Sequence, residues 1–549
     1  MIKLLNSKIN SITSAAIIVA AASVASRLLG IFRDRILAGE FGAGDVLDIY
    51  YAAFRVPDLV FNLLVLGALS AGFIPIFTGL CERKTIFKFL WRGKEKCSPE
   101  AWYVANSIVN LLGIALIVLS GVLMIFTPWL MKLITPGFEG EKLAMTVAMT
   151  RVMFLSPVFL GLSSVMGGVL QSFKRFFVYS LAPIMYNIGI IIGILYFVPV
   201  WGVYGLAYGV VFGALLHFLI QVPAAFHLGY RWQPIMSLRN KNVRDIMIMM
   251  VPRTLSLAVG QINLVIITII ASTLAVGSLA IFNLANNLQS FPIGIFGISF
   301  AVAAFPTLSS LVDSQQALIK NFSKVLRQII FFILPATVFI LTLRAQIIRI
   351  ILGSGHFGWE DTILTMDTLT FFSLSLFAQA TIPLLVRIFY VRKNSKTPFV
   401  VGLISAAANV FLSFWLAQKM GVAGLALAFS IASIINFALL WLILKVELGD
   451  LDEVAILYST LKISLASVGA GLAVQAMKLI IGNSSIINMH KFWGVFTQAF
   501  IAGIFGLLIF ILICWVLRSE ELYNFVRSVR VKSKREKLET EDRGEARGI

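Results

Sequence analysis

Four arginines stand inside or against stretches that otherwise look like membrane-spanning helix. They are Arg27, Arg33 and Arg55 near the start of the chain and Arg253 near its middle. A charge at bilayer depth costs about 2.5–3.5 kcal/mol on insertion scales, so such residues normally face a polar cavity on the path of a substrate. A guanidinium offers phosphate two parallel hydrogen bonds and stays charged at any physiological pH. The four positions therefore predict that an anion is bound within the membrane.

Carboxylates accompany the first three arginines. Arg27 and Asp34 are seven residues apart, so they share a helix face, while Arg33 points to a neighbouring angle. Asp48 and Arg55 have the same spacing, which predicts an ion pair that an incoming anion would displace. The alternative interpretations are interfacial charges for Arg33 and Asp34 and a purely structural pair for Asp48 and Arg55.

The elements that must hold these charges are membrane helices. Hydrophobic residues make up 59% of the 549, charged residues only 13%, and the mean hydropathy is +0.92. Apolar runs of 18 or more residues are long enough to cross the bilayer as helix. We count about fourteen, near 12–31, 47–78, 103–128, 143–171, 178–199, 203–225, 246–274, 278–311, 326–351, 362–387, 398–418, 421–445, 457–482 and 492–517. The prediction is an all-α polytopic membrane protein.

Lysines and arginines between these runs fall on alternate sides of the predicted membrane. By the positive-inside rule, this places both termini of the multi-pass protein in the cytoplasm. The net charge of +19 is spread over many loops on that side, which argues against a nucleic-acid partner. The basic tail 518–549 lacks apolar periodicity and is predicted to be disordered near anionic lipid headgroups.

The chain appears to repeat itself. Three pairs of marks recur in order at offsets of 219 to 231 residues: GVYGLA at 202–207 with GVAGLA at 421–426, Asn187 with Asn409, and Pro75 with Pro306. An even number of spans in each unit gives two six-helix lobes of the same orientation, residues 1–225 and 226–445. Transporters built from such repeats bind substrate near the midplane between them. Spans one, two, seven and eight should line that cleft, and spans thirteen and fourteen, within 446–517, lie outside the repeat.

Cysteine and histidine usage gives no sign of a metal or a cofactor. The three cysteines, Cys81, Cys97 and Cys514, are odd in number and lie on or near the predicted inner side, so we expect reduced thiols. The four histidines show no metal-ligand spacing with Cys or carboxylates. No cofactor is predicted, and the identity of a coupling ion stays open.

Several short motifs together carry a family resemblance. They are SRLLG at 26–30 followed by Arg33-Asp34, FGAG at 41–44 followed by Asp48, AFRVP at 53–57, GALS at 67–70 with FIP at 73–75, QIN at 261–263, FPIGIFGISFAVAAFPTLS within 284–309, and Phe389-Tyr390 before KTP at 396–398. Over roughly 12–517 the chain resembles the MurJ (MviN) family of bacterial lipid II flippases, in the multidrug/oligosaccharidyl-lipid/polysaccharide exporter superfamily.

The resemblance implies fourteen helices, two six-helix lobes around a cationic cleft, and a groove for a lipid tail at the last two helices. The substrate would be the undecaprenyl-diphosphate-linked peptidoglycan precursor. The residues matching Arg27, Arg33 and Asp34 belong to the family's binding cleft, and Asp48 matches another acidic position associated with function.

The sequence departs from the family pattern in span eight. The family usually has an arginine after Ala-Asp or Ala-Asn there, whereas Ala285-Asn286 is followed by Asn287. The arginine of the second lobe is therefore missing from the expected diphosphate clamp. We include Asn287 in the predicted site, together with Arg253 as the candidate replacement from span seven. Other uncharged polar residues in these two spans are Gln261, Asn263, Asn283, Asn286 and Gln289.

The leading hypothesis is a flippase, not an enzyme, with lipid II or a related undecaprenyl-diphosphate glycolipid as its partner among the membrane lipids. The alternatives are an exporter of another lipid-linked oligosaccharide and a noncatalytic scaffold that binds cell-wall synthesis proteins. A drug/cation antiporter would need carboxylates in the cleft, whereas this one is net basic. An enzyme would need paired carboxylates or a nucleophile at the membrane surface. The only acidic cluster, at 447–453, is better explained as a solvated loop.

Overall fold

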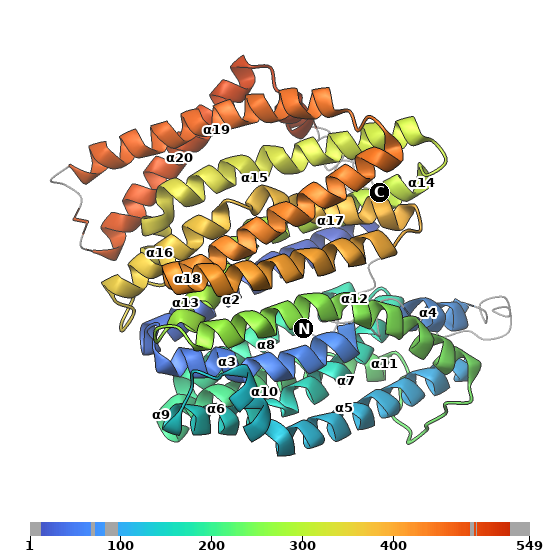
Figure 1. The fold of residues 1–549 in the computed structure, drawn as a ribbon. Helices are drawn as coiled ribbons and strands as arrows, with labels where there is room; N and C mark the ends of the chain where they lie inside the picture. The colour runs from blue at the N-terminus through green and yellow to red at the C-terminus, as the bar shows by residue number, and fades with distance from the viewer. Residues whose placement is uncertain (1–11, 67–71, 83–96, 484–487, 490, 528–549) are drawn as a thin grey trace, which may run out of the picture. The chain divides into compact units, whose positions relative to one another are not determined.

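The computed structural model describes residues 12–66, 72–82, 97–483, 488–489 and 491–527, except for the side chains at 12–17, 66, 251–253 and 255–257. All regular structure in these ranges is helical, as predicted (Figure 1). The helices up to residue 272 are α2 (Ile12–Phe41), α3 (Asp45–Phe61), η1 (Asn62–Leu66), α4 (Ile74–Glu82), α5 (Pro99–Ile134), α6 (Gly140–Met153), α7 (Leu155–Ser172), α8 (Phe176–Ile192), η4 (Gly193–Phe197), α9 (Val198–Trp201), α10 (Tyr204–Leu219), α11 (Val222–His227) and α12 (Lys241–Ser272). The later ones are α13 (Ser278–Pro292), η5 (Ile293–Ile298), α14 (Ser299–Ser310), α15 (Gln315–Ile351), α16 (Trp359–Ser373), α17 (Leu376–Val391), α18 (Lys396–Leu448), α19 (Glu453–Gly482) and α20 (Phe492–Val516).

Many of these helices are long and apolar enough to cross a membrane. Among the described residues nine pass on length and composition, or ten when the bent pair α16 and α17 counts as one span. One of the nine, α18, contains a sharp break at Gly421, whose φ of 58° and ψ of −138° are not helical. The break falls between the predicted spans 398–418 and 421–445. The total of fourteen spans stays a prediction.

The chain forms two compact units. One comprises Met1–Leu284, Ile351–Thr365 and Ala406–Ala428, and the other comprises Ala285–Ile350, Met366–Ser405 and Phe429–Ile549. Residues of the predicted span seven thus cluster with the first six spans. The lobe boundaries 1–225 and 226–445 stay a prediction.

Glycines let the helices of the first unit approach closely. A Cβ at Gly189 would overlap the Cα of Gly213, and one at Gly193 would overlap the Cα of Gly209. Helices α8 and α10 therefore pack backbone against backbone, the small-residue packing that is typical of membrane helices. Helix α2 packs on α8, and α12 packs on α3 and α5. These contacts bring the polar positions of α2, α3 and α12 into one unit.

In the second unit α15 lies between two apolar clusters. One face packs with α14, α17 and the end of α18 through residues such as Leu326, Ile329 and Leu384. The other face, through Phe331 and Leu343, packs with α19 and α20. Figure 1 shows α15 beside α19 and α20. The two C-terminal helices are thus attached to their unit through α15.

The repeated glycine motifs have the same backbone geometry. Gly202 has φ 59° and ψ −149°, close to the values at Gly421. A Cβ at Gly205 would overlap the backbone of Phe197, and a Cβ at Gly424 would overlap that of Leu416, at the same separation in the chain. Both motifs thus turn one helix tightly into the next, and only glycine leaves the space for it.

Two further pairs of features recur at the offsets of the sequence repeat. Lys174 and Lys393, which follow α7 and α17, have positive φ values of 58° and 59° and lie 219 residues apart. The π-helical segments η1 and η5 begin at Asn62 and Ile293, an offset of 231 that equals that of Pro75 and Pro306. Such π segments interrupt α-helices at sites of local bending and often at functional positions. The repeat is therefore present in local structure as well as in sequence.

The expectation of reduced thiols is wrong for two of the three cysteines. Cys81 and Cys97 are joined as a disulfide, with their Cα atoms 4.3 Å apart, while Cys514 is free and buried. Neither the odd number of cysteines nor their predicted side of the membrane gives information on the distance between Cys81 and Cys97. The fold brings the end of α4 close to the residues that precede α5, which a sequence separation of 16 does not reveal.

Candidate functional site

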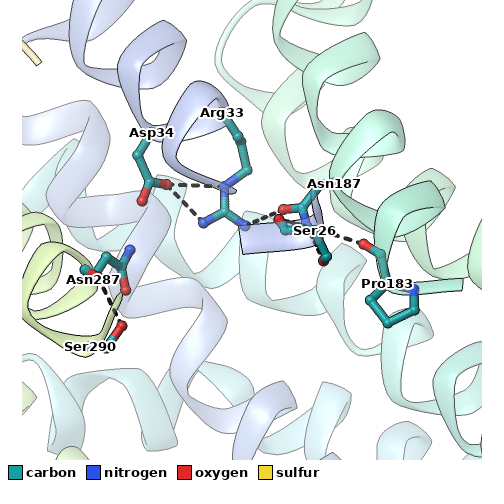
Figure 2. Close-up of polar contacts among 7 residues, drawn as sticks. All are labelled: Ser26, Arg33, Asp34, Pro183, Asn187, Asn287 and Ser290. Atoms are coloured by element: carbon teal, nitrogen blue, oxygen red, sulfur yellow. Dashed lines mark hydrogen bonds and ion pairs between the residues drawn. The ribbon is translucent and has the colours of Figure 1, made fainter. Parts of the chain in front are cut away.

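Arg33 and Asp34 form a neutral ion pair in α2 that also binds α8. The Arg33 Nε and Nη2 donate to Asp34 Oδ1 at 3.1 and 2.8 Å, and Nη1 donates to Asn187 Oδ1 at 3.1 Å (Figure 2). The side chains are 19% and 7% exposed, respectively, so the guanidinium remains the more accessible partner. Since a guanidinium has five N–H groups, donors remain for a further acceptor. Both side chains are thus largely covered by protein, and the depth of the pair in the membrane stays a prediction.

Asn187 holds the Arg33 side chain in place. Its Nδ2 donates to the carbonyl oxygens of Pro183 at 3.1 Å and Ser26 at 3.3 Å, which leaves Oδ1 facing the guanidinium (Figure 2). The amide orientation is therefore set by two backbone acceptors. A neutral acceptor positions Arg33 without removing its charge.

Arg55 in α3 is held by uncharged partners from two other helices. Its Nε donates to Thr268 Oγ1 of α12 and its Nη2 to Asn283 Oδ1 of α13, both at 2.9 Å. Asp58 lies one helical turn further along α3, but no ion pair joins it to Arg55 within the described part of the chain. Arg55 is thus contacted by residues of two other predicted spans, and neither contact cancels its positive charge.

Arg27 is the third cation of this unit. It lies in α2 two turns before Asp34 and is partly buried. Across the described ranges it makes no hydrogen bond or ion pair to another residue. An arginine in this state has all five donors available for a ligand.

Asp48 does not pair with Arg55, so the predicted ion pair is wrong. Its carboxylate instead accepts from the backbone N–H groups of Gly277 at 2.8 Å and Ala280 at 2.9 Å, and from Lys142 Nζ of α6 at 3.3 Å. Gly277 and Ala280 lie at the N-terminus of α13, where free N–H groups and the helix dipole favour an anion. Seven-residue spacing placed Asp48 and Arg55 on one face of α3, but each side chain reaches a nearer partner on another helix.

The backbone just before Asp48 is in direct contact with the backbone of two other segments. A Cβ at Gly277 would overlap the carbonyl oxygen of Ala43, and a Cβ at Gly355 would overlap that of Gly39. His356 donates its backbone N–H to the Gly39 carbonyl at 2.8 Å. The turn between α2 and α3 is therefore packed tightly against the segments that precede α13 and α16.

Two of the predicted site residues lie elsewhere or are not described. Arg253 belongs to α12, but its side chain falls outside the described residues. Asn287 belongs to the second unit, and its carbonyl accepts from Ser290 Oγ at 2.8 Å (Figure 2). Sequence reasoning missed Lys142 and Thr268 as partners, and it used Asn187 only as a mark of the repeat. No spacing rule connects these residues to Asp48, Arg55 or Arg33, because each contact joins separate helices.

Comparison with known proteins identifies the family. The sequence model described as "Lipid II flippase MurJ" matches residues 37–512. A probable lipid II flippase MurJ of Rhizobium tropici is 30% identical over 432 residues, which cover 76% of this chain and 78% of that protein.

Solved structures agree on the fold. The inward closed conformation of a lipid II flippase MurJ superposes with a TM-score of 0.72 at 24% identity, covering 93% of this chain and all of the other. An inward-facing multidrug resistance MATE family transporter of the MOP superfamily gives 0.63 at 14% identity, covering 80% of this chain and 99% of that one. At these identities the structures show a shared fold.

The three bonds to Asp48 predict a structural role that can be measured apart from transport. We expect Asp48→Asn to lower the free energy of unfolding by about 1–3 kcal/mol, because it breaks a buried charged pair and leaves a donor unsatisfied. Thermal unfolding in detergent would measure this. Asp45→Asn is the matched control, because Asp45 contacts the same Lys142 but its side chain is 56% exposed, so we expect at most about 1 kcal/mol. Equal melting temperatures for wild type and Asp48→Asn would contradict the assignment.

Proposed function

We propose, from the premise that this chain belongs to the MurJ family, that it is a lipid II flippase. It moves the undecaprenyl-diphosphate-linked peptidoglycan precursor from the inner to the outer leaflet of the bacterial cytoplasmic membrane by alternating access. The observation that carries the proposal is the set of three partly buried arginines, of which Arg27 and Arg55 have no carboxylate in ion-pair contact among the described residues. Transport of this kind requires no bond to be made or broken in the protein, so the chain is a transporter.

The diphosphate is the part of the substrate that these arginines recognise. Arg55 is fixed by Thr268 and Asn283, so little side-chain entropy is lost when a phosphate oxygen replaces or joins a neutral acceptor. Before the substrate binds, Arg33 is paired with Asp34, which lowers the free-energy cost of burying the guanidinium in the empty site. Phosphate oxygens compete well for a guanidinium because two parallel hydrogen bonds form.

The contacts of Asp48 serve as a latch in this cycle. Asp48 joins α3 to the N-terminus of α13, and beside it the backbone at Gly277 directly contacts that at Ala43. Opening the protein at this end requires these hydrogen bonds to break. Asp48 would then influence transport through the gate and not through direct contact with the diphosphate.

The remaining assignments follow the family. Residues 1–225 and 226–445 are taken as the two lobes, α19 and α20 as the groove for the polyprenyl tail, and both termini as cytoplasmic. Lipid II within the membrane is the partner, and cell-wall synthesis proteins are further candidates. A different lipid-linked oligosaccharide is the second candidate substrate, which Asn287 favours because it stands where the family usually has an arginine.

The central test is flipping in a bacterium that is depleted of its resident lipid II flippase. Expression of the wild-type chain should restore lipid II to the outer leaflet, and Arg27→Ala should abolish that exposure because a free guanidinium is lost. Arg151→Ala is the control, since Arg151 is exposed and its Nε donates to a backbone carbonyl of α5. Full activity of Arg27→Ala would exclude a cationic site at this position. No rescue by well-inserted wild-type protein would favour another lipid-linked glycan.

A second test separates the charge of Arg55 from its packing. Asn283→Asp places a carboxylate where Nη2 now donates at 2.9 Å, so it should neutralise Arg55 and reduce lipid II exposure strongly. Asn283→Ala removes the hydrogen bond but keeps the charge, and we expect a smaller loss, equivalent to about 1 kcal/mol. The same outer-leaflet assay measures both. An alanine variant that is as inactive as the aspartate variant would show that position 283 acts through packing.

Arg253 is the candidate to supply the missing cation of the second lobe. If it does, Arg253→Gln should lower lipid II exposure while leaving expression and membrane insertion unchanged. Introducing Asn287→Arg in that background should then restore part of the activity, because it returns a cation to the usual family position. Unimpaired flipping by Arg253→Gln would refute the replacement.

A further inference from the structure

A short segment before α12, residues 231–235, is held against α5 by hydrogen bonds to Asn106 and Asn110; we call it the pinned segment. Asn106 donates to the Arg231 carbonyl and accepts from the Gln233 backbone N–H, both at 3.0 Å. Asn110 donates to the carbonyls of Gln233 and Ile235 at 2.7 and 2.9 Å. The Trp232 Nε1 closes the set by donating to Asn110 Oδ1 at 3.0 Å. The segment is thus held beside α5 by hydrogen bonds, and a space remains next to them.

A cavity of about 470 Å³ lies in that space, within the first unit. Its volume falls within the roughly 300–1,000 Å³ of ordinary ligand pockets. The walls are supplied by α5, α7, α10, α11 and the pinned segment, and nearly all are apolar; they include Ile114, Ile117, Met166, Val222, Phe226 and Trp232. At its mouth Ile114 is 46% exposed and Trp232 59% exposed. A hydrocarbon chain is the ligand that such walls favour.

A cation stands at the edge of this cavity. The Arg231 guanidinium lies 5.6 Å from the centre of the Phe226 ring, and its Nη1 donates to the carbonyls of Phe226 and Tyr230 at 2.9 Å each. Arg231 is exposed, and in the described part of the chain no carboxylate pairs with it. Burial raises the pKa of Tyr230 to about 12, so this wall of the cavity stays uncharged at physiological pH.

The pinned segment also lines a second space, whose walls combine polar and apolar residues. This hollow measures about 520 Å³ and is lined by Arg231, Tyr103, Asn106 and Gln233 among others. Arg239, Lys241 and Arg244 follow within the next residues of the chain. The pinned segment therefore lines both the apolar cavity, through Trp232, and a second hollow that includes the cation of Arg231. An amphiphile needs both kinds of surface.

We propose that this is a binding site for an anionic phospholipid of the surrounding membrane. One acyl chain occupies the cavity between α5 and the pinned segment, and the phosphate contacts Arg231. Aromatic and basic residues at the edge of a membrane protein hold lipids in this way. The cavity accommodates an ordinary acyl chain but only a fraction of a polyprenyl chain, so the site is distinct from the one proposed for lipid II.

The test uses the full-length protein in phosphatidylcholine nanodiscs that contain phosphatidylglycerol with a photoreactive acyl chain. Crosslinks should map to peptides that contain residues 109–117 and 218–236. Ile114→Trp should block them because it fills the mouth, while Ile125→Trp should not, since Ile125 is 73% exposed on the same helix but does not line the cavity. Arg231→Gln should reduce crosslinking about fivefold, the equivalent of roughly 1 kcal/mol for one basic residue near an anionic surface, and Arg239→Gln should reduce it less.

Two outcomes would overturn the proposal. Equal labelling by a phosphatidylcholine probe, together with no effect of Arg231→Gln, would show a groove without headgroup selection. Competition by undecaprenyl phosphate at lower concentration than unlabelled phosphatidylglycerol would assign the groove to the substrate tail. Melting temperatures of all variants, measured before the lipid is added, separate lost binding from lost folding. The first outcome leaves the proposed flippase function untouched, because that proposal rests on Arg27, Arg33 and Arg55. The second would move the proposed tail groove from α19 and α20 to this cavity.

Discussion

The organisation of this protein depends on the cost of placing charge inside a hydrocarbon layer. Three buried charges of the first unit are stabilised in different ways. Asp48 is neutralised by Lys142 and by two N–H groups at a helix N-terminus, which makes it a structural anchor. Arg33 is neutralised by its sequence neighbour Asp34. Arg55 donates to two neutral acceptors, and Asp58, one helical turn away, makes no ion pair with it within the described part of the chain. The degree of compensation is the basis on which we assign Asp48 to the fold and propose Arg55 as part of the anion site.

The internal repeat provides the scaffold for this arrangement. Asn187 joins its helix to Ser26 of α2, and the matching Asn409 donates its Nδ2 to Asn263 of α12 at 2.9 Å. In both halves, an asparagine of the fifth predicted span thus binds the first span of its own half. The first half has Arg33 on this asparagine, whereas the second has an uncharged amide. The two halves thus share the contact between the asparagine and the first span, but only the first half has a charged residue, Arg33, at this contact.

Much of the fold could be predicted from the sequence because hydropathy and glycine are local signals. The division of α18 followed from hydropathy, which predicted separate spans at 398–418 and 421–445, and Gly421 has the same positive φ as Gly202 of the matching motif. The arginines themselves were found because charge in an apolar run is conspicuous. Their partners were not, since Thr268 and Lys142 reach α3 across helix packing that no spacing rule encodes. The disulfide of Cys81 and Cys97 was missed for the same reason.

Neutral hydrogen-bond partners at a cation have a consequence for how an anion binds and leaves. A cation that was fully paired with carboxylates would release its partner only at a high electrostatic cost, and the anion would gain little by entering. A cation with no partners at all would be expensive to keep in the empty protein. The amide and hydroxyl groups around Arg55 fall between these limits: they orient the guanidinium and satisfy part of its hydrogen-bonding capacity but leave its field intact. A diphosphate that binds there adds attraction without displacing a charge, and it can leave without stranding one. Binding strong enough to load and weak enough to release is what a flippase requires of its site.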